Sequence, residues 1–143
     1  MNLNKFTIKA QEAVQQAQQI AMSKTHQSIE PAHLLKGILE VDENVTPYLF
    51  KKLGVNQNMV VQTLDRMIES MPRVEGGGQY LSQKSNQALA KAQDLLKEFG
   101  DEFVSIEHLL LGLLEIKDQA TSMLNDAGVE KKGLISAIHE LRK

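Results

Sequence analysis

The sequence predicts an all-α fold, and three observations support this. Apolar residues recur at the three-and-four spacing of helices along nearly the whole chain. No stretch shows the sustained alternation of apolar and polar residues that is typical of half-buried strands. The 143 residues are 42% hydrophobic and 24% charged, which excludes a disordered chain. We therefore expect one domain, residues 1–143, built from helices.

The first half of the chain is expected to hold four helices. Thr7 is placed to cap the first helix, in which Ala10, Ala13 and Ala17 form an apolar stripe opposite a glutamine-rich face. Later stripes predict the other three helices: Leu34, Leu35, Ile38 and Leu39; Val45, Tyr48, Leu49 and Leu53; and Val60, Leu64, Met67 and Ile68. Pro31 suits a first helical position, and Gly54 is expected to end a helix.

The second half of the chain is a copy of the first. A shift of 75 places aligns Thr7 with Ser82, Ala13 with Ala88, His33 with His108 and Gly37 with Gly112, and after a one-residue slip Gly54 aligns with Gly128. Between the copies, Pro72 and three consecutive glycines prevent a helix over residues 71–80. We therefore expect repeat 1 (residues 6–70), a connector (residues 71–80) and repeat 2 (residues 81–143). Together they would form eight helices with pseudo-twofold symmetry.

Charge and composition exclude several classes of function. The net charge is −2 and no cluster of Lys and Arg is present, which argues against nucleic-acid binding. No apolar run approaches the ~18 to 20 residues of a membrane span, and the first ten residues lack the apolar core of a signal peptide. We therefore expect a cytoplasmic protein that does not enter a membrane. Without cysteine, the chain has no disulfide, thiolate nucleophile or Cys-type metal site.

No motif for catalysis, metal binding or cofactor binding is found. Gly128 and Gly133 have the spacing of phosphate-loop glycines, but Leu134 follows where the loop needs Lys. The four histidines form no His-Glu-x-x-His pair. Because His33 and His108 are repeat equivalents just inside predicted helices, we expect a capping or core-edge hydrogen-bonding role for both. The sequence thus predicts no catalytic residue, metal ligand or cofactor in this chain.

The residues that precede predicted helices leave two interpretations open. Phe6 and Phe103 each lie just before a helix start, so each could staple that helix to the chain before it or line a partly exposed apolar groove. The groove candidates are the apolar residues near helix starts: Leu3, Phe6, Leu81, Phe103 and Val104.

Several strings resemble the Clp family of ATP-driven unfoldases. Phe6-Thr7 with the alanines after it, and His26-Gln27-x-Ile29-Glu30-Pro31-x-His33-Leu34-Leu35, are similar to that family's first N-terminal repeat. Gly100-Asp101-x-Phe103-Val104-Ser105-x-Glu107-His108-Leu109-Leu110 is similar to the second repeat. Ile29-Glu30-Pro31 and Pro72-x-Val74-Glu75-Gly76 point to the branch of protein disaggregases. The resemblance covers essentially the whole chain.

The resemblance implies a substrate-recognition domain of a chaperone that disaggregates stress-denatured proteins. In that family the domain sits on a hexameric ring of ATPase modules, and ATP and magnesium belong to those modules, which this sequence lacks. The partners implied are unfolded or aggregated proteins, the ring, and a 70-kDa heat-shock chaperone system that cooperates through a middle domain. The polar positions that the family links to substrate capture fall on Thr7, Asp101 and Glu107, and a purely structural role for each remains open.

One alternative within the family is also open. In a sister branch that works with a protease, the domain docks folded adaptors, and paired acidic sites in the two repeats read phosphorylated arginine. Repeat 2 here has Glu107 at that position, but repeat 1 has Ala32. This departure argues against two-site phosphoarginine recognition.

Overall fold

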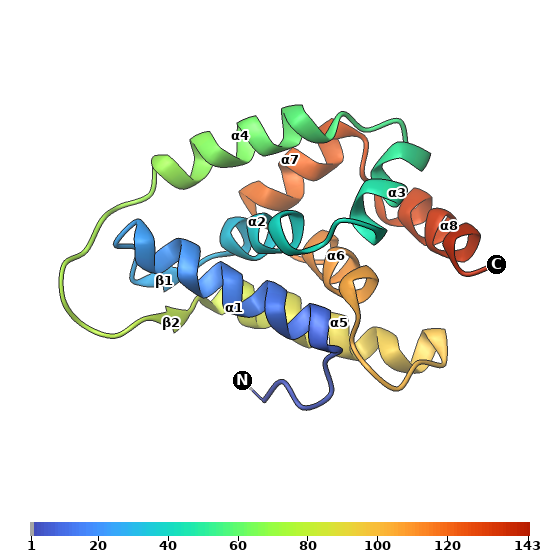
Figure 1. The fold of residues 1–143 in the computed structure, drawn as a ribbon, viewed down its shortest axis with the longest axis horizontal. Coiled ribbons are helices and arrows are strands. Elements are labelled where there is room, and N and C mark those ends of the chain that lie inside the picture. Colours follow the sequence, from blue (N-terminus) through green and yellow to red (C-terminus); the bar gives the residue numbers. More distant parts are fainter. Residues whose placement is uncertain (1) are drawn as a thin grey trace.

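The computed structural model describes residues 2–143, which contain eight helices (Figure 1). The helices of repeat 1 are α1 (Ile8–Ser23), α2 (Pro31–Val41), α3 (Val45–Lys52) and α4 (Gln57–Glu69). Those of repeat 2 are α5 (Gln83–Phe99), α6 (Ile106–Leu114), α7 (Gln119–Ala127) and α8 (Lys131–Leu141). Two short strands, β1 (Ser28–Ile29) and β2 (Tyr80–Leu81), complete the secondary structure. None of the helices in residues 2–143 has the length and apolar character needed to cross a membrane.

The two repeats have the same order of helices and share one hydrophobic core. Within each repeat the long first helix packs along the second, α1 on α2 and α5 on α6. The later helices cross over, because α3 contacts α8 and α4 contacts α7. In Figure 1, α4 and α7 lie together at the top, and α1 and α5 lie below α2 and α6. The predicted all-α duplication is confirmed, and neither repeat buries its apolar faces without the other.

Equivalent residues begin and end equivalent helices. The Thr7 hydroxyl accepts a hydrogen bond from the Ala10 N–H at 3.1 Å, and the Ser82 hydroxyl accepts one from the Ser85 N–H at 3.0 Å. Each cap satisfies a backbone donor that the first helical turn leaves without a partner. Gly128 directly follows α7 with a φ of 107°, in the left-handed region that favours glycine. The predicted cap at Thr7 and the predicted stop at Gly128 are therefore confirmed.

A glycine in the second helix of each repeat allows that helix to pack closely against the long first helix, α2 against α1 and α6 against α5. A Cβ atom on Gly37 would lie 2.4 Å from the carbonyl oxygen of Ala13, and one on Gly112 would lie 2.3 Å from that of Ala88. Contacts this short are not tolerated between a carbon and a backbone oxygen. The alanine stripes of α1 and α5 are thus explained by backbone-to-backbone packing, for which only small residues leave room.

The structure corrects two details of the expected helices-only fold. β1 and β2 form a parallel pair in which Ile29 lies opposite Leu81, and Phe6 and Val104 form an isolated parallel bridge. Elements of one or two residues are too short to produce an alternating pattern, so the sequence did not predict them. The second correction concerns Tyr48, which was expected on the buried stripe of α3 but is 37% exposed.

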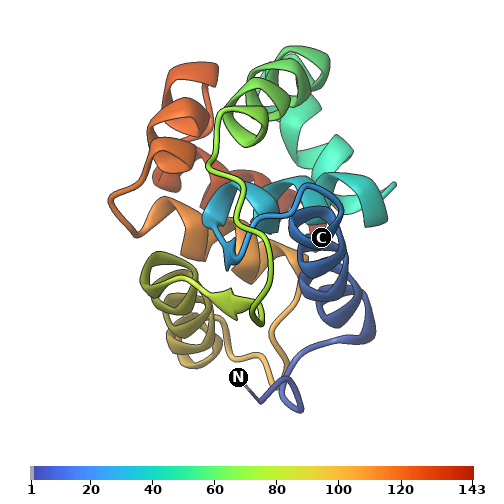
Figure 2. The same ribbon diagram turned by 90° about the vertical axis from the view of Figure 1, so that its left-hand side faces the viewer.

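The connector crosses the molecule on its surface, from the end of α4 to β2 (Figure 2). Most of its residues are exposed, and Gly76 and Gly77 adopt positive φ angles of 77° and 78°. Its two ends are tied to repeat 1, because the Val74 N–H donates to the Thr25 carbonyl at 2.9 Å and the Tyr80 N–H donates to the Gln27 carbonyl at 3.1 Å. The connector therefore follows the segment between α1 and β1.

Candidate functional site

The N-terminal segment and the loop between α5 and α6 bring several predicted binding residues together. The Thr7 N–H donates to the Val104 carbonyl at 2.8 Å, and the Val104 N–H donates to the Lys5 carbonyl at 2.7 Å, so Phe6 lies beside Val104. Leu81 lies apart from this junction, in β2. Leu81 pairs with Ile29 there. Phe6 and Leu81 are 75 residues apart, and so are their partners Ile29 and Val104. The segment before the first helix of each repeat is therefore attached to the other repeat in the same way.

Burial divides the predicted groove residues into two groups. Phe6 and Val104 are 2% and 0% exposed and belong to the hydrophobic core. The expectation that they line an open groove is therefore wrong for this structure, because backbone pairing turns both side chains inward. Leu3 and Leu81 are half-buried against the core, and Phe103 is 44% exposed. A groove lined by both phenylalanine rings is not present in the described residues.

The acidic candidates face an arginine of the same chain. Arg142, the residue that follows α8, places its guanidinium 2.9 Å from the Asp101 carboxylate and 3.1 Å from the Glu107 carboxylate. The same guanidinium lies over the Phe99 ring, 5.3 Å from its centroid. Burial would lower the pKa of Arg142, but the hydrogen bonds to Asp101 and Glu107 outweigh burial and raise it. Both carboxylates therefore have an intramolecular partner that anchors the end of α8.

The two equivalent histidines have the capping role expected for them. The Nδ1 atom of His33 accepts a hydrogen bond from the Glu30 N–H at 2.8 Å, and that of His108 accepts one from the Ser105 N–H at 2.9 Å. Each imidazole thus satisfies a backbone donor just before its helix. In repeat 2 the other ring nitrogen, Nε2 of His108, lies 2.8 Å from the Asp101 carboxylate. Burial lowers the pKa of His108 even though Asp101 acts in the opposite direction.

A narrow apolar cleft with only about 10 Å³ of accessible space lies where α1 and α2 meet α5 and α6, on the pseudo-twofold axis. In Figure 2 α1 and α5 lie on opposite sides of the lower half of the molecule. Eight apolar residues line the cleft, four from each repeat: Ala13, Val14, Leu34, Ile38, Ala88, Leu89, Leu109 and Leu113. They form four pairs of residues 75 positions apart. The cleft is thus a seam at which equivalent faces of the two repeats meet, without a charged or polar side chain in its lining.

Sequence reasoning missed this cleft. Its residues belong to the helical stripes, and those stripes predicted the buried core without showing where the core reaches the surface. The repeat alignment carried the available signal, because a pseudo-twofold axis brings equivalent residues such as Ala13 and Ala88 towards each other. Seven of the eight lining residues are buried, and Val14 alone among them is half-buried.

A wider hollow lies between α4 and α7. Met59 and Met123 contribute apolar surface to it, and Met59 is 61% exposed. Most of the other lining residues are polar, Asp118 and Asp126 among them, but the surface that the lining leaves accessible is mainly apolar. The hollow is far larger than the cleft between α1 and α5, with about 880 Å³ of accessible space against about 10 Å³. The cleft differs from it in having no polar side chain in its lining. In residues 2–143, no group of three or more His, Asp or Glu side chains gathers in a way that could hold a metal ion.

Comparison with known proteins identifies the family. Residues 5–127 match the Clp repeat (R) N-terminal domain. The whole chain is 53% identical to the chaperone protein ClpB of Bacteroides thetaiotaomicron and 43% identical to that of Porphyromonas gingivalis, over 143 residues in each case. It spans 17% of the length of either relative.

Solved structures show the same fold. The N-terminal domain of Hsp104 from Candida albicans superposes with a TM-score of 0.81 at 23% identity, over 97% of this chain and 92% of that one. The N-terminal domain of the ClpV1 ATPase from E. coli superposes with a TM-score of 0.82 at 22% identity, over 97% of this chain and 86% of that one. With its two similar four-helix repeats and a family match over most of its length, the chain belongs to the Clp repeat N-terminal domain family.

Proposed function

We propose that this domain captures apolar segments of unfolded or aggregated proteins for a larger ATP-dependent chaperone. The observation that carries the proposal is the cleft between α1 and α5, whose lining is apolar throughout. The cleft holds only about 10 Å³ in this structure, so the two repeats would have to separate along it to admit a client side chain. An unfolded chain exposes the apolar side chains that a folded protein buries, and a cleft without polar groups binds them without requiring a particular sequence. The similarity to ClpB chaperones supports the same reading.

The expected affinity is low. Burying one leucine side chain of a client contributes about 1.5–3 kcal/mol. Ordering the client backbone costs about 1–2 kcal/mol per residue, so only part of this contribution remains. A single domain should therefore bind with a dissociation constant in the micromolar range or weaker. We place the domain on a hexameric ring in the cytoplasm, where several weak sites act on one client by avidity.

The chemistry of the whole chaperone is assigned to parts outside this chain. ATP and magnesium would act in ring modules that hydrolyse ATP, and a middle domain would connect the ring to a 70-kDa heat-shock chaperone system. Thr7, Asp101 and Glu107 support capture indirectly in this proposal. Thr7 caps α1, and the two carboxylates hold Arg142.

A methyl-labelled NMR titration with α-casein, a protein without a stable fold, tests the proposal. Shift changes are expected at the methyl groups of Val14, Leu89, Leu109 and Leu113. Val14→Ser should weaken binding about tenfold, because it puts a hydroxyl at the edge of the apolar cleft. Ile8→Ser is the matched control: Ile8 is a β-branched residue of the same helix, 76% exposed and outside the cleft lining.

Three results would contradict the proposal. Shift changes confined to the hollow between α4 and α7 would place binding elsewhere. Equal weakening by Val14→Ser and Ile8→Ser would show that the cleft is not the site. No response to casein, together with tight binding of one folded adaptor, would instead support an adaptor-docking domain.

A further inference from the structure

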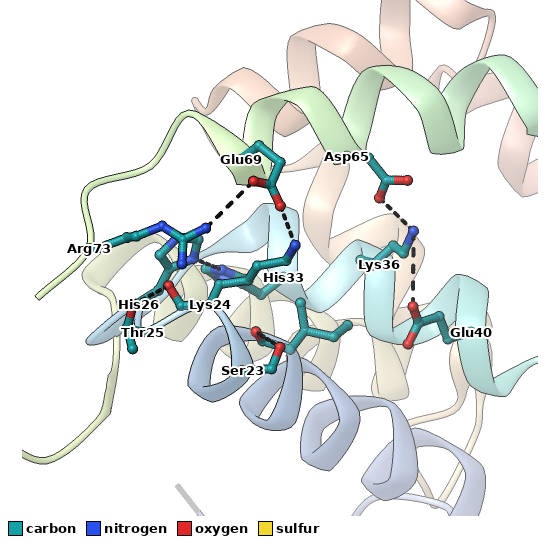
Figure 3. A network of polar contacts seen from close by, with 11 residues as sticks. Ser23, Lys24, Thr25, His26, His33, Lys36, Glu40, Asp65, Glu69 and Arg73 are labelled. Carbon is teal, nitrogen blue, oxygen red and sulfur yellow. Dashed lines mark hydrogen bonds and ion pairs between the residues drawn. The ribbon is translucent and has the colours of Figure 1, made fainter. Parts of the chain in front are cut away.

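Two buried imidazoles contact each other in repeat 1, near the end of α1 (Figure 3). His26 and His33 are 3% and 0% exposed, and Nδ1 of His26 lies 2.9 Å from Nε2 of His33. The Nδ1 atom of His33 already accepts the Glu30 N–H at 2.8 Å, so the ring proton of His33 must be on Nε2. This proton is donated to Nδ1 of His26, and the proton of His26 is therefore on its own Nε2.

This arrangement requires both imidazoles to be neutral. A second proton on His33 would go to Nδ1 and face the Glu30 N–H, so that two donors would oppose each other. A second proton on His26 would also go to Nδ1 and face the Nε2–H of His33. In either case a buried hydrogen bond is lost and a charge is left in a poorly solvated place. The pair therefore holds together only while neither ring is charged.

The charged groups around the pair do not compensate for such a proton. Lys24 follows α1, Arg73 lies in the connector, and both pair with Glu69 of α4, Arg73 at a distance of 3.6 Å (Figure 3). On the other side, the Glu30 carboxylate accepts a hydrogen bond from the Ser28 hydroxyl at 2.8 Å. The negative charge of Glu69 is thus shared by two cations.

The direction of the pKa shifts agrees with this geometry. Burial, with a smaller contribution from His26, lowers the pKa of His33 to about 4. Burial and the nearby Arg73 and Lys24 lower the pKa of His26, and only Glu69 acts in the opposite direction. Both rings therefore resist protonation while they are buried against each other.

In repeat 2 a carboxylate, instead of an imidazole, accepts the hydrogen bond from the equivalent histidine. The equivalent of His26 is Asp101, which accepts from His108 and is held by Arg142 at 2.9 Å. An aspartate at this place is still an acceptor when His108 gains a proton, and the Ser105 hydroxyl lies 3.0 Å from Nδ1 of His108, where it can accept as well. The acid-sensitive arrangement is thus specific to repeat 1.

The histidine pair lies beneath the attachment of the connector. The His26 carbonyl accepts a hydrogen bond from the side-chain amide of Gln79 at 3.1 Å, and the flanking Thr25 and Gln27 carbonyls accept from Val74 and Tyr80. In addition, Nε2 of His26 and Oε1 of Gln79 are buried without a hydrogen-bond partner among the described residues. Burying these two polar atoms without partners makes the attachment of the connector to repeat 1 less favourable.

We propose that the His26–His33 pair is an acid-sensitive latch, which holds the connector on repeat 1 near neutral pH and releases it when either imidazole gains a proton. Release would separate residues 72–80 from the segment before β1. It would also weaken the β1–β2 pair, which joins the two repeats through Ile29 and Leu81. The proposal concerns the connector and does not depend on which ligand the domain binds.

Amide hydrogen exchange of the 143-residue chain, followed by NMR at pH 7 and pH 5, tests the latch. After correction for the intrinsic exchange rate, protection of the Val74 and Tyr80 amides should fall at least tenfold at pH 5. The Leu110 amide in the core, which exchanges only on global unfolding, should stay better protected than the connector amides at both pH values. Spectra of the histidine rings should show His26 and His33 neutral at pH 6, with the proton on Nε2.

The matched variant is His26→Asp, which gives repeat 1 the residue that repeat 2 has at this place. It should keep the connector amides protected at pH 5. If His26→Asp does not fold, His26→Asn replaces it: its side-chain oxygen accepts from His33 and cannot itself gain a proton, so the loss of connector protection at pH 5 should be smaller than in the unmodified chain. The latch is wrong if the connector amides of the unmodified chain stay protected at pH 5, or if the variant loses their protection as the unmodified chain does.

Discussion

Gly37→Ala should destabilise the domain, although alanine is the better helix former. The new Cβ atom would lie 2.4 Å from the Ala13 carbonyl oxygen and 2.9 Å from the Ala17 nitrogen, and both are backbone atoms of α1. Restoring an ordinary contact of at least 3.4 Å requires α2 to move away from α1 by about 1 Å. A gap of this size removes a quarter to a half of the dispersion energy of the contacts along the crossing.

The expected magnitude follows from two opposing contributions. Overpacking a buried contact costs about 1–3 kcal/mol, and here the upper part of this range applies because backbone on both sides resists movement. Replacing glycine within a helix returns about 1 kcal/mol. The free energy of unfolding should therefore fall by about 2 kcal/mol, and the melting temperature by about 6–8 °C for a chain of this size.

Urea unfolding followed by circular dichroism measures this change. Gly112→Ala, the equivalent substitution in repeat 2, should have a similar effect, because its Cβ atom would lie 2.3 Å from the Ala88 carbonyl oxygen. Gly133→Ala in α8 is the control, since its Cβ atom would meet only the end of the Leu53 side chain, at 3.3 Å. The reasoning is refuted if Gly37→Ala is as stable as the unmodified chain, or if Gly133→Ala is destabilised to the same extent.

Two further predictions concern the polar groups. The free energy of unfolding should fall by about 2 kcal/mol from pH 7 to pH 5, because His33, with a pKa of about 4 when folded and about 6.5 when unfolded, gains its proton mainly on unfolding. This stability is present above pH 6.5 and is lost as the pH falls towards 4; urea titrations that show no loss would contradict it. Arg142→Ala should cost about 2 kcal/mol, because it leaves two carboxylates without their cation and uncovers an aromatic ring. Thermal melts should show no comparable loss for Lys143→Ala, whose side chain is 75% exposed.

Local sequence signals predicted most of the fold. The stripe in α1, the hydroxyl cap at Thr7 and the stop at Gly128 each depend on residues within one or two helical turns. Duplication was visible as well, since it is a property of residue order. These features are determined by short-range geometry, which a single sequence contains in full.

The candidate site was harder to predict, because burial and partner choice depend on distant parts of the chain. Phe6 directly precedes a helix, a position that leaves its burial undetermined from sequence, and it is buried where its backbone pairs with Val104. Asp101 and Glu107 have no visible partner in the sequence, and the folded structure pairs both with Arg142 at the end of α8. Nothing near any of these residues in the sequence identifies its partner.

By itself, the sequence determined that this protein is a helical duplication with capped helices and a glycine-rich connector. The tertiary structure decided which apolar side chains are buried, where the apolar faces of the two repeats meet, and which histidines contact each other. The physical reason is the sequence separation of the interacting residues. Helix formation and capping depend on residues a few positions apart. A cleft, a long-range ion pair or a contact between helices forms only after segments far apart in the chain have packed together.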